Sequence, residues 1–125
     1  MGLKILLVDD DHFVAEPTKL ILEMFGYDVK LFSSSIEALD HFSQDIDILF
    51  VDFHLADLNG LELCKKIKSL KENVLTVFYS GDLNNTELKS YVVEASNNAV
   101  FLSKPASIDQ ISTALSTITN RLVCA

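Results

Sequence analysis

Aspartates follow two short apolar runs of this sequence, at the point where each run ends. Ile5-Leu6-Leu7-Val8 leads into Asp9-Asp10-Asp11, and Ile48-Leu49-Phe50-Val51 leads into Asp52. An unbroken apolar run of this length is typical of a strand buried on both faces, as in a parallel sheet covered by helices. Such sheets bind ligands at the carboxyl ends of their strands, and acids that meet there repel one another unless a cation or a proton joins them. The ends of these two predicted strands are therefore the first candidate site.

Two further polar side chains follow later apolar segments and complete a set suited to phosphoryl chemistry. Ser80 follows one segment and Lys104-Pro105 follows another. Oxygen ligands suit Mg²⁺, and a lysine beside carboxylates serves as a point charge for a phosphate oxygen. An aspartate can act as a nucleophile and become an aspartyl phosphate. Phosphoryl transfer then depends on positioning and charge neutralisation more than on covalent help from the protein.

Strand-like and helix-like patterns alternate five times along the chain. The predicted strands cover residues 3–9, 29–32, 46–52, 74–79 and 99–103. The predicted helices cover residues 13–25, 35–43, 60–70 and 85–96, and a final helix starts at residue 107. Because crossovers between parallel strands are right-handed, five βα units in so short a chain predict a parallel sheet with helices on both faces.

Local signals mark several ends of the predicted helices. Capping boxes are expected at the start of two helices, at Ser34-Glu37 and Ser107-Gln110. Gly26 is expected to be the C-cap near the end of the first helix, and Asn84 or Asn85 to cap the fourth helix. Pro17 lies inside the first helical pattern, although proline is favourable only in the first turn of a helix. That helix is therefore expected to start late or to bend.

Composition and charge favour a single acidic domain. The chain has 125 residues, of which 49% are hydrophobic, enough for one core. It carries 18 acidic and 10 basic residues without a basic run, which speaks against direct nucleic-acid binding. No apolar stretch approaches the roughly 20 residues of a membrane span, and no signal-peptide pattern begins the chain. Cys64 and Cys124 form no disulfide or metal pattern, so a cytoplasmic location is expected.

Five short motifs together resemble the receiver domain of two-component response regulators. They are Val8-Asp9-Asp10, Val51-Asp52, Gly60 eight residues after Asp52, Tyr79-Ser80-Gly81, and Phe101-Leu102-Ser103-Lys104-Pro105. Each motif is weak alone, but all five occur in order, at family spacing, along the whole chain. The resemblance implies a flavodoxin-like, doubly wound (βα)5 fold of the α/β class, with a five-stranded parallel sheet of order 2-1-3-4-5. Residues 1–125 are expected to form one receiver domain without an effector domain.

The resemblance also implies roles for the polar residues at the strand ends. Asp52 would be the phosphoacceptor. Asp10 and Asp52 would bind Mg²⁺ (or Mn²⁺) directly, together with the backbone carbonyl of His54, and Asp9 would act through a water molecule. Lys104 would pair with the phosphoryl oxygens.

A switch and its partners are implied in the same way. Ser80 would hydrogen-bond a phosphoryl oxygen, and Phe101 would swing inward as Ser80 moves. The surface formed by the helix at 85–96 and by the strand and helix after it would then change and bind a downstream protein target or output domain. The phosphoryl donor would be a sensor histidine kinase or a histidine phosphotransfer protein. The Lys104-Pro105 peptide bond is often cis in this family.

These residues also have ordinary structural interpretations. Asp11 is more simply a helix N-cap than a ligand. Asp9 and Asp10 would be capping acids if they bound no metal. The side chain of His54 either overhangs the site or faces solvent from a loop. By composition alone, Phe101 is a core residue of a strand.

The chain departs from the family pattern just after Asp52. Leu55 and Ala56 stand where the family usually has a Met-Pro pair. Because proline restricts the conformations of a loop, its absence is expected to loosen this loop and to alter phosphorylation kinetics.

Three other functions compete with a phosphorylated receiver. The first is a pseudo-receiver that acts as a phosphorylation-independent interaction or dimerisation module. The second is a phosphohydrolase of haloacid-dehalogenase type, which needs a second aspartate where His54 stands. The third is an FMN-binding flavodoxin, which needs a phosphate-binding loop that this sequence lacks after its first strand. The resemblance favours a signalling domain with at most slow autodephosphorylation over an enzyme proper.

Overall fold

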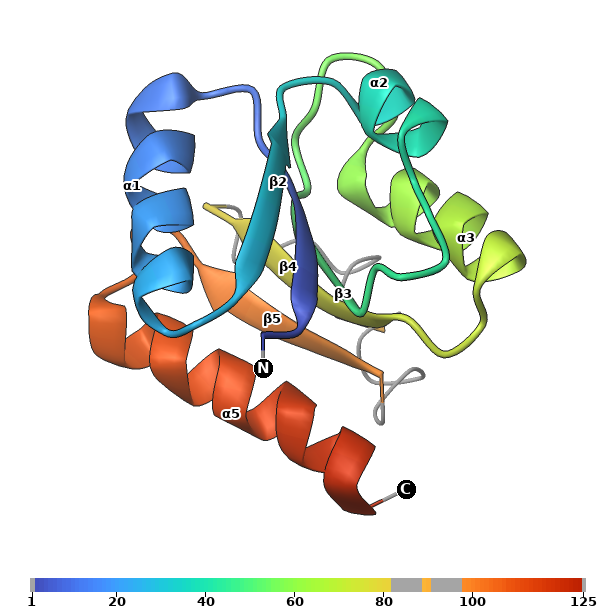
Figure 1. The fold of residues 1–125 in the computed structure, drawn as a ribbon. Helices are drawn as coiled ribbons and strands as arrows, with labels where there is room; N and C mark the ends of the chain where they lie inside the picture. Colours follow the sequence, from blue (N-terminus) through green and yellow to red (C-terminus); the bar gives the residue numbers. More distant parts are fainter. Residues whose placement is uncertain (1, 82–88, 91–97, 125) are drawn as a thin grey trace.

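Five parallel strands form one sheet in the order β2-β1-β3-β4-β5, as the sequence analysis predicted (Figure 1). The computed structural model describes residues 2–81, 89–90 and 98–124, with side chains described as far as residue 120. The elements are β1 (Lys4–Val8), α1 (His12–Met24), β2 (Asp28–Phe32), α2 (Ser35–Asp40), β3 (Ile48–Asp52), α3 (Gly60–Leu70), β4 (Leu75–Ser80), β5 (Ala99–Ser103) and α5 (Ile108–Cys124). The predicted helix at 85–96 and its predicted cap fall almost entirely outside the described residues.

Helices cover both faces of this sheet. Helices α1 and α5 lie on one face, and α2 and α3 on the other (Figure 1). Along β1, Leu6 and Val8 pack in the core on the side of α2 and α3, whereas Ile5 and Leu7 pack in the core on the side of α1 and α5. Each fully buried aliphatic side chain of this kind contributes about 1.5–3 kcal/mol. The unbroken apolar run is therefore explained by two cores, one on each side of the strand.

The strand register brings the predicted polar residues to one edge of the sheet. Val8 pairs with Val51, so Asp9 and Asp52 follow paired positions on neighbouring strands. Asp52 in turn pairs with Tyr79 of β4. At the far side, the backbone N–H of Lys104 donates to the carbonyl of Ser80 over 2.9 Å. The carboxyl ends of β1, β3, β4 and β5 thus meet.

Most of the predicted helix caps are present. The Asp11 side chain accepts a hydrogen bond from the N–H of Phe13, which makes Asp11 the N-cap of α1. Both bonds of the capping box between Ser107 and Gln110 are formed. The C-cap of α1 is Phe25 and not Gly26, which comes next with a φ of 93°, a conformation that favours glycine. The predicted late start of α1 is wrong, because the helix begins at His12 and contains Pro17, and the alternative of a bend stays a prediction.

The largest differences from the predicted bounds lie between α2 and β3. Helix α2 ends at Asp40 instead of residue 43, and β3 begins at Ile48 instead of residue 46. Ile46 is fully buried, but its N–H donates to the carbonyl of Ser43 in a turn. An apolar side chain that enters the core from a turn looks like part of a strand in the sequence, and this explains the error.

Candidate functional site

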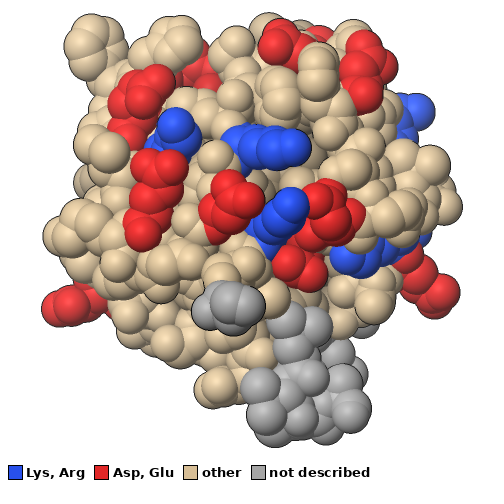
Figure 2. Space-filling view, in the orientation of Figure 1, with Lys and Arg blue, Asp and Glu red and all other residues tan. Residues whose placement is uncertain are grey.

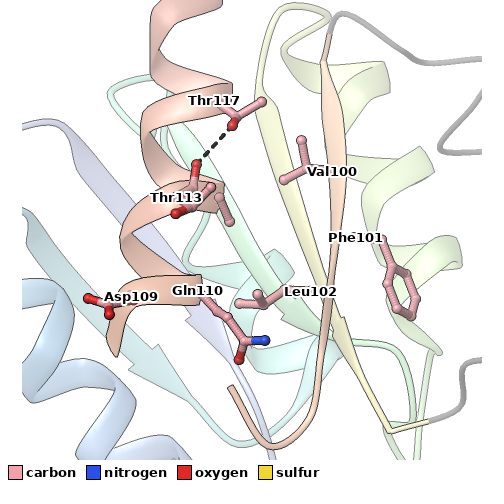
Figure 3. A pocket seen from close by; sticks show the side chains of 8 residues that line it. Val100, Phe101, Leu102, Asp109, Gln110, Thr113 and Thr117 are labelled. Carbon is pink, nitrogen blue, oxygen red and sulfur yellow. Dashed lines mark hydrogen bonds between the residues drawn. The ribbon is translucent and has the colours of Figure 1, made fainter. Parts of the chain in front are cut away.

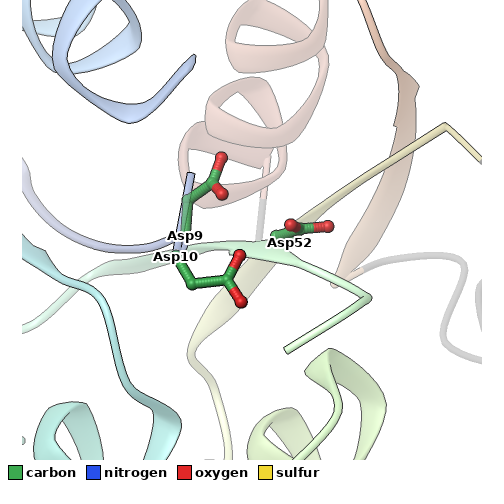
Figure 4. Close-up of side chains that lie close together, drawn as sticks. All are labelled: Asp9, Asp10 and Asp52. Atoms are coloured by element: carbon green, nitrogen blue, oxygen red, sulfur yellow. The ribbon is translucent and has the colours of Figure 1, made fainter. Parts of the chain in front are cut away.

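Three carboxylates gather at the carboxyl ends of β1 and β3. One oxygen from each of Asp9, Asp10 and Asp52 lies within 4.8 Å of the other two. Figure 4 shows Asp9 and Asp10 leaving the end of β1 beside Asp52. Asp9 and Asp52 are buried, with 1% and 6% of their surface exposed, whereas Asp10 is exposed. The structure therefore brings together the three acids that the sequence predicted as metal ligands, with one of them open to solvent.

Lys104 supplies the positive charge of this cluster. Its Nζ lies 3.0 Å from Oδ2 of Asp52 and 3.3 Å from Oδ2 of Asp9. Burial opposes the charge of the ammonium, but hydrogen bonds and charge from Asp52 and Asp9 outweigh burial, so the pKa of Lys104 is raised above its ordinary value. The lysine is thus held in its charged form between two carboxylates.

At Asp9, in contrast to Lys104, burial outweighs the interactions that favour the charged form. Burial is the largest influence on its carboxyl and raises its pKa above the ordinary value, with a smaller contribution from the charge of Asp52. The backbone N–H of Asp11, which donates to Oδ1 of Asp9 over 3.0 Å, and the nearby Lys104 both oppose this shift. The negative charge at this buried position is therefore incompletely compensated by the protein.

Tyr79 is a member of the site to which the sequence analysis assigned no role, although it stands in the motif Tyr79-Ser80-Gly81. The Nζ of Lys104 lies 4.9 Å from the centroid of the Tyr79 ring, within the range of a cation–π interaction. The ring of Tyr79 meets the ring of Phe50 edge-on, with centroids 5.6 Å apart. Lys104 is therefore held by an aromatic face as well as by two carboxylates. The available signal was the aromatic residue directly before Ser80.

The position of Asp52 is fixed by the start of the following loop. The N–H of His54 donates to Oδ1 of Asp52 over 3.2 Å, which leaves Oδ2 to Lys104. The His54 side chain is exposed, and its ring packs edge-on against the ring of Phe53 at 5.1 Å. The solvent-facing interpretation of this histidine agrees with its exposure. The role of its carbonyl as a metal ligand stays a prediction.

Gly60 allows α3 to begin directly beside the site. Its N–H donates to the carbonyl of Phe53 over 2.8 Å. A Cβ at this position would lie 2.7 Å from the carbonyl oxygen of Asp52 and 2.9 Å from Cα of Phe53, closer than real Cβ contacts. The spacing of Gly60 from Asp52 therefore has a steric reason. A capping box between Asn59 and Glu62, which the sequence analysis missed, starts the same helix.

The two predicted switch residues lie on adjoining strands. Ser80 is fully buried at the end of β4. Phe101 is partly buried in β5 and packs against the core on the side of α2 and α3. Its side chain points away from the β5 face that carries Val100 and Leu102 (Figure 3). The switch itself stays a prediction. The Lys104-Pro105 peptide bond is cis, as expected.

The cluster fits a hard divalent cation. Its donors are carboxylate oxygens, the ligands that Mg²⁺ and Mn²⁺ prefer, and the exposed Asp10 gives access from solvent. Among the described residues, no other group of histidine, cysteine or acidic side chains has the spacing of a metal site.

The surface agrees with an acidic protein. On the face shown in Figure 2, lysines lie among acidic side chains and form no continuous basic patch. The chain as a whole has a formal charge of −8. Within the described part of the chain, no helix is long and apolar enough to cross a bilayer.

Comparison with known proteins identifies relatives of the chain. Residues 5–116 match the response regulator receiver domain family. The chain is 32% identical over 110 residues to the CAI-1 autoinducer sensor kinase/phosphatase CqsS of Vibrio cholerae, and 37% identical over 75 residues to the response regulator MprA of Mycobacterium bovis. These alignments cover 85% and 59% of the chain but only 16% and 33% of the relatives. The chain therefore spans a third or less of the length of these two proteins.

Solved structures share the fold over the full chain. A CheY-like receiver domain protein from Methanospirillum hungatei has a TM-score of 0.84 at 24% identity, and a receiver domain protein from Clostridium thermocellum has 0.80 at 25%. Both comparisons cover 100% of each chain. The five-stranded order and the helices on both faces are thus those of known receiver domains. Since the family match also spans most of the sequence, the chain belongs to the receiver domains of two-component response regulators.

Proposed function

We propose that Asp52 accepts a phosphoryl group from a phosphohistidine of a sensor kinase or a histidine phosphotransfer protein. The observation that carries the proposal is the position of the Asp52 carboxylate at the end of β3. Its Oδ2 lies 3.0 Å from the ammonium of Lys104, and its oxygens lie beside those of Asp9 and Asp10. A carboxylate nucleophile, an ammonium and a set of oxygen ligands together meet the requirements of phosphoryl transfer.

The chemistry follows from the contacts of Asp52. An oxygen of its carboxylate attacks the phosphorus, the N–P bond of the donor breaks, and the imidazole leaves with the bond electrons. The ammonium of Lys104 donates a hydrogen bond to Oδ2 before the reaction, and it then donates to an oxygen of the incoming phosphoryl group instead. A Mg²⁺ or Mn²⁺ ion held by Asp9, Asp10, Asp52 and the carbonyl of His54 would neutralise charge on the phosphoryl oxygens.

The consequence of phosphorylation would be a change of surface. We propose that Ser80 moves to the new dianion and that Phe101 moves inward with it. A cavity of about 440 Å³, lined mainly by residues of β5 and α5, lies on the expected output surface (Figure 3). Val100, Leu102 and Ala114 give it an apolar lining on which a downstream protein or output domain would dock.

A role as phosphoacceptor domain also implies how the chain is organised and where it acts. Residues 1–125 would act as one receiver unit with at most slow autodephosphorylation and without direct contact with nucleic acid or membrane. We expect a reducing, cytoplasmic compartment, in keeping with the buried thiol of Cys64, whose sulfur lies 3.3 Å from the hydroxyl oxygen of Thr76.

Phosphorylation of Asp52 can be tested directly. Incubation with acetyl phosphate or a phosphohistidine donor and Mg²⁺ should add one base-labile, hydroxylamine-sensitive phosphoryl group, detected by intact mass and by reductive trapping of the aspartyl phosphate. Asp52→Asn should abolish the mass increase. Asp47→Asn is the matched control, because Asp47 lies just before the opposite end of β3. A wild-type protein that gains no phosphoryl group, or an Asp52→Asn variant that still gains one, would refute the proposal.

A phosphorylation-independent pseudo-receiver is the alternative, and the complete acidic set with Lys104 speaks against it. The two functions differ in one measurable property. A receiver binds its partner differently after treatment with acetyl phosphate, whereas a pseudo-receiver binds equally well with Asp52→Asn and without the donor.

A further inference from the structure

The loop that follows Asp52 is tied to a distant segment of the chain. Oδ2 of Asp57 accepts hydrogen bonds from the hydroxyl of Ser34 at 2.7 Å and from the N–H of Ile36 at 3.0 Å. Oδ1 of Asp57 accepts a third bond from the N–H of Ser35 at 3.2 Å. One exposed carboxylate thus uses both oxygens to bind the start of α2.

A fourth hydrogen bond runs in the opposite direction. The hydroxyl of Ser35, a fully buried residue, donates to the carbonyl of Leu58 at 2.6 Å. All four bonds join residues that are 21 to 23 positions apart in the sequence. The N–H of Ile36, followed by the Ser34 hydroxyl and the N–H of Ser35, holds the pKa of Asp57 well below its usual range. Asp57 is therefore charged near neutral pH and accepts three hydrogen bonds from the start of α2.

These hydrogen bonds restrain the loop that follows Asp52, which the sequence predicted to be loosened by the absence of proline. Residues 53–59 contain Leu55 and Ala56 in place of the Met-Pro pair that usually stiffens this loop. Hydrogen bonds fix both ends of the segment. The N–H of His54 donates to Oδ1 of Asp52, and the N–H of Gly60 donates to the carbonyl of Phe53. Between these ends, Asp57 and Leu58 provide the described contacts to the α2 segment.

We propose that Asp57 is a positioning residue for the Asp52 site and replaces by hydrogen bonds the restraint that proline gives elsewhere in the family. A loop that is ordered in advance does not lose its backbone entropy when a cation or a phosphoryl group binds. The tether would thereby hold the His54 backbone, the expected metal ligand, in place. The inference rests on the proposed function of the site. The competing explanation is that Asp57 only stabilises the start of α2.

Two variants separate these explanations. Asp57→Ala removes three hydrogen bonds, and Asp57→Asn keeps one acceptor oxygen. Asp45→Ala is the matched control, because Asp45 is also exposed and accepts hydrogen bonds from Lys4 and Ser43, beside the amino-terminal ends of β1 and β3. The readouts are the dissociation constant for Mg²⁺ by calorimetry, the rate of phosphorylation by acetyl phosphate, and amide hydrogen exchange of residues 53–59 in the metal-free protein.

We expect Asp57→Ala to weaken Mg²⁺ binding about tenfold, the usual size of a loss among residues that support metal ligands, and to slow phosphorylation to a similar extent. Exchange of residues 53–59 should accelerate, Asp57→Asn should be intermediate, and Asp45→Ala should match the wild type. Ser34→Ala, which leaves the backbone bonds of Asp57 in place, serves if Asp57→Ala does not fold and should weaken Mg²⁺ binding by a smaller factor.

The outcomes distinguish this inference from the proposed function. If the wild type is phosphorylated on Asp52 and binds Mg²⁺, but Asp57→Ala shows the same affinity, rate and exchange, Asp57 only stabilises α2 and the inference is overturned. If the wild type neither binds Mg²⁺ nor accepts a phosphoryl group, the proposed function fails and the inference fails with it.

Discussion

The ammonium of Lys104 lies 3.0 Å from Oδ2 of Asp52, although 51 residues separate them between the end of β3 and the residue after β5. Each of these two charged groups compensates the charge of the other. The buried carboxylate requires a nearby cation, and the lysine, with 19% of its side chain exposed, requires an anion. The pair holds the site together before any phosphoryl group arrives.

Removing the ammonium should destabilise the metal-free protein. Lys104→Met leaves the buried carboxylates of Asp9 and Asp52 without their cation, and we expect a loss of about 1–3 kcal/mol in the free energy of unfolding. Urea unfolding measures this loss. Lys4→Met is the control, because the exposed pair between Lys4 and Asp45 should contribute little. Equal losses in the free energy of unfolding for the two substitutions would show that the buried ion pair stabilises the protein no more than the exposed one.

Mg²⁺ should stabilise the folded chain through its acidic cluster. At a concentration 100 times the dissociation constant, binding adds about 2.7 kcal/mol to the free energy of unfolding. Asp10→Asn should remove most of this gain, and the metal-free variant should be slightly more stable than the wild type because one of three mutually repelling carboxylates is gone. Thermal unfolding with and without Mg²⁺ tests both effects, with Asp47→Asn as control. An undiminished gain in Asp10→Asn would contradict the predicted ligand set.

Tyr79 and Lys104 should be energetically coupled. The ring centroid of Tyr79 lies 4.9 Å from Nζ of Lys104, so a double-mutant cycle of Tyr79→Leu with Lys104→Met should give a coupling of about 1 kcal/mol. The same cycle with Tyr79→Phe should give almost none, because phenylalanine keeps the aromatic face. Urea unfolding of the four proteins of each cycle provides the values. A similar coupling for Leu and Phe would assign the effect to the phenol hydroxyl.

A methyl group at Gly60 should distort the site. Because the added Cβ would lie 2.7 Å from the Asp52 carbonyl oxygen, the backbone of either α3 or β3 must shift, and we expect Gly60→Ala to cost about 1–3 kcal/mol. Phosphorylation of Asp52 should slow in the same variant. Gly81→Ala is the control, since apart from the chain neighbours of Gly81 no atom of the described residues lies within 4 Å of its Cβ position. Calorimetry and the acetyl phosphate assay report the two effects, and an unchanged stability would argue against the close contact.

Acid should remove the contribution of Asp57 to stability. Its pKa is lowered in the folded protein by hydrogen bonds, first of all from the N–H of Ile36. A carboxyl whose folded pKa is depressed stabilises the fold fully above its unfolded pKa of 3.8 and loses that effect as the pH falls through the folded value. Asp57→Ala should therefore be less stable than the wild type by about 1 kcal/mol at pH 6, with the difference shrinking below pH 3.8. A difference that is independent of pH would contradict a charged tether.

Short-range patterns in the sequence were enough for the framework and for most of the site. Alternating strand and helix patterns predicted a parallel sheet with helices on both faces, because buried strands and amphipathic helices follow periods of a few residues, whereas the strand order was implied by the family resemblance. The strand ends then placed Asp9, Asp10, Asp52 and Lys104 together, since parallel strands end at one edge of a sheet. The bounds near Ile46 were missed because an apolar residue in a buried turn has the same composition as a strand.

Other features depended on contacts between segments that are distant in the sequence. The sequence predicted a looser loop after Asp52 from the missing proline, whereas the structure shows four hydrogen bonds that tie Asp57 and Leu58 to the start of α2. The contact between the Tyr79 ring and the ammonium of Lys104 likewise joins distant segments, and the unequal burial of Asp9 and Asp10 was not visible in any local pattern. The sequence by itself determined which residues reach the carboxyl edge of the sheet, because local periodicity sets the strands. Only the tertiary structure decided how those residues are held, because hydrogen bonds and burial depend on which distant segments meet.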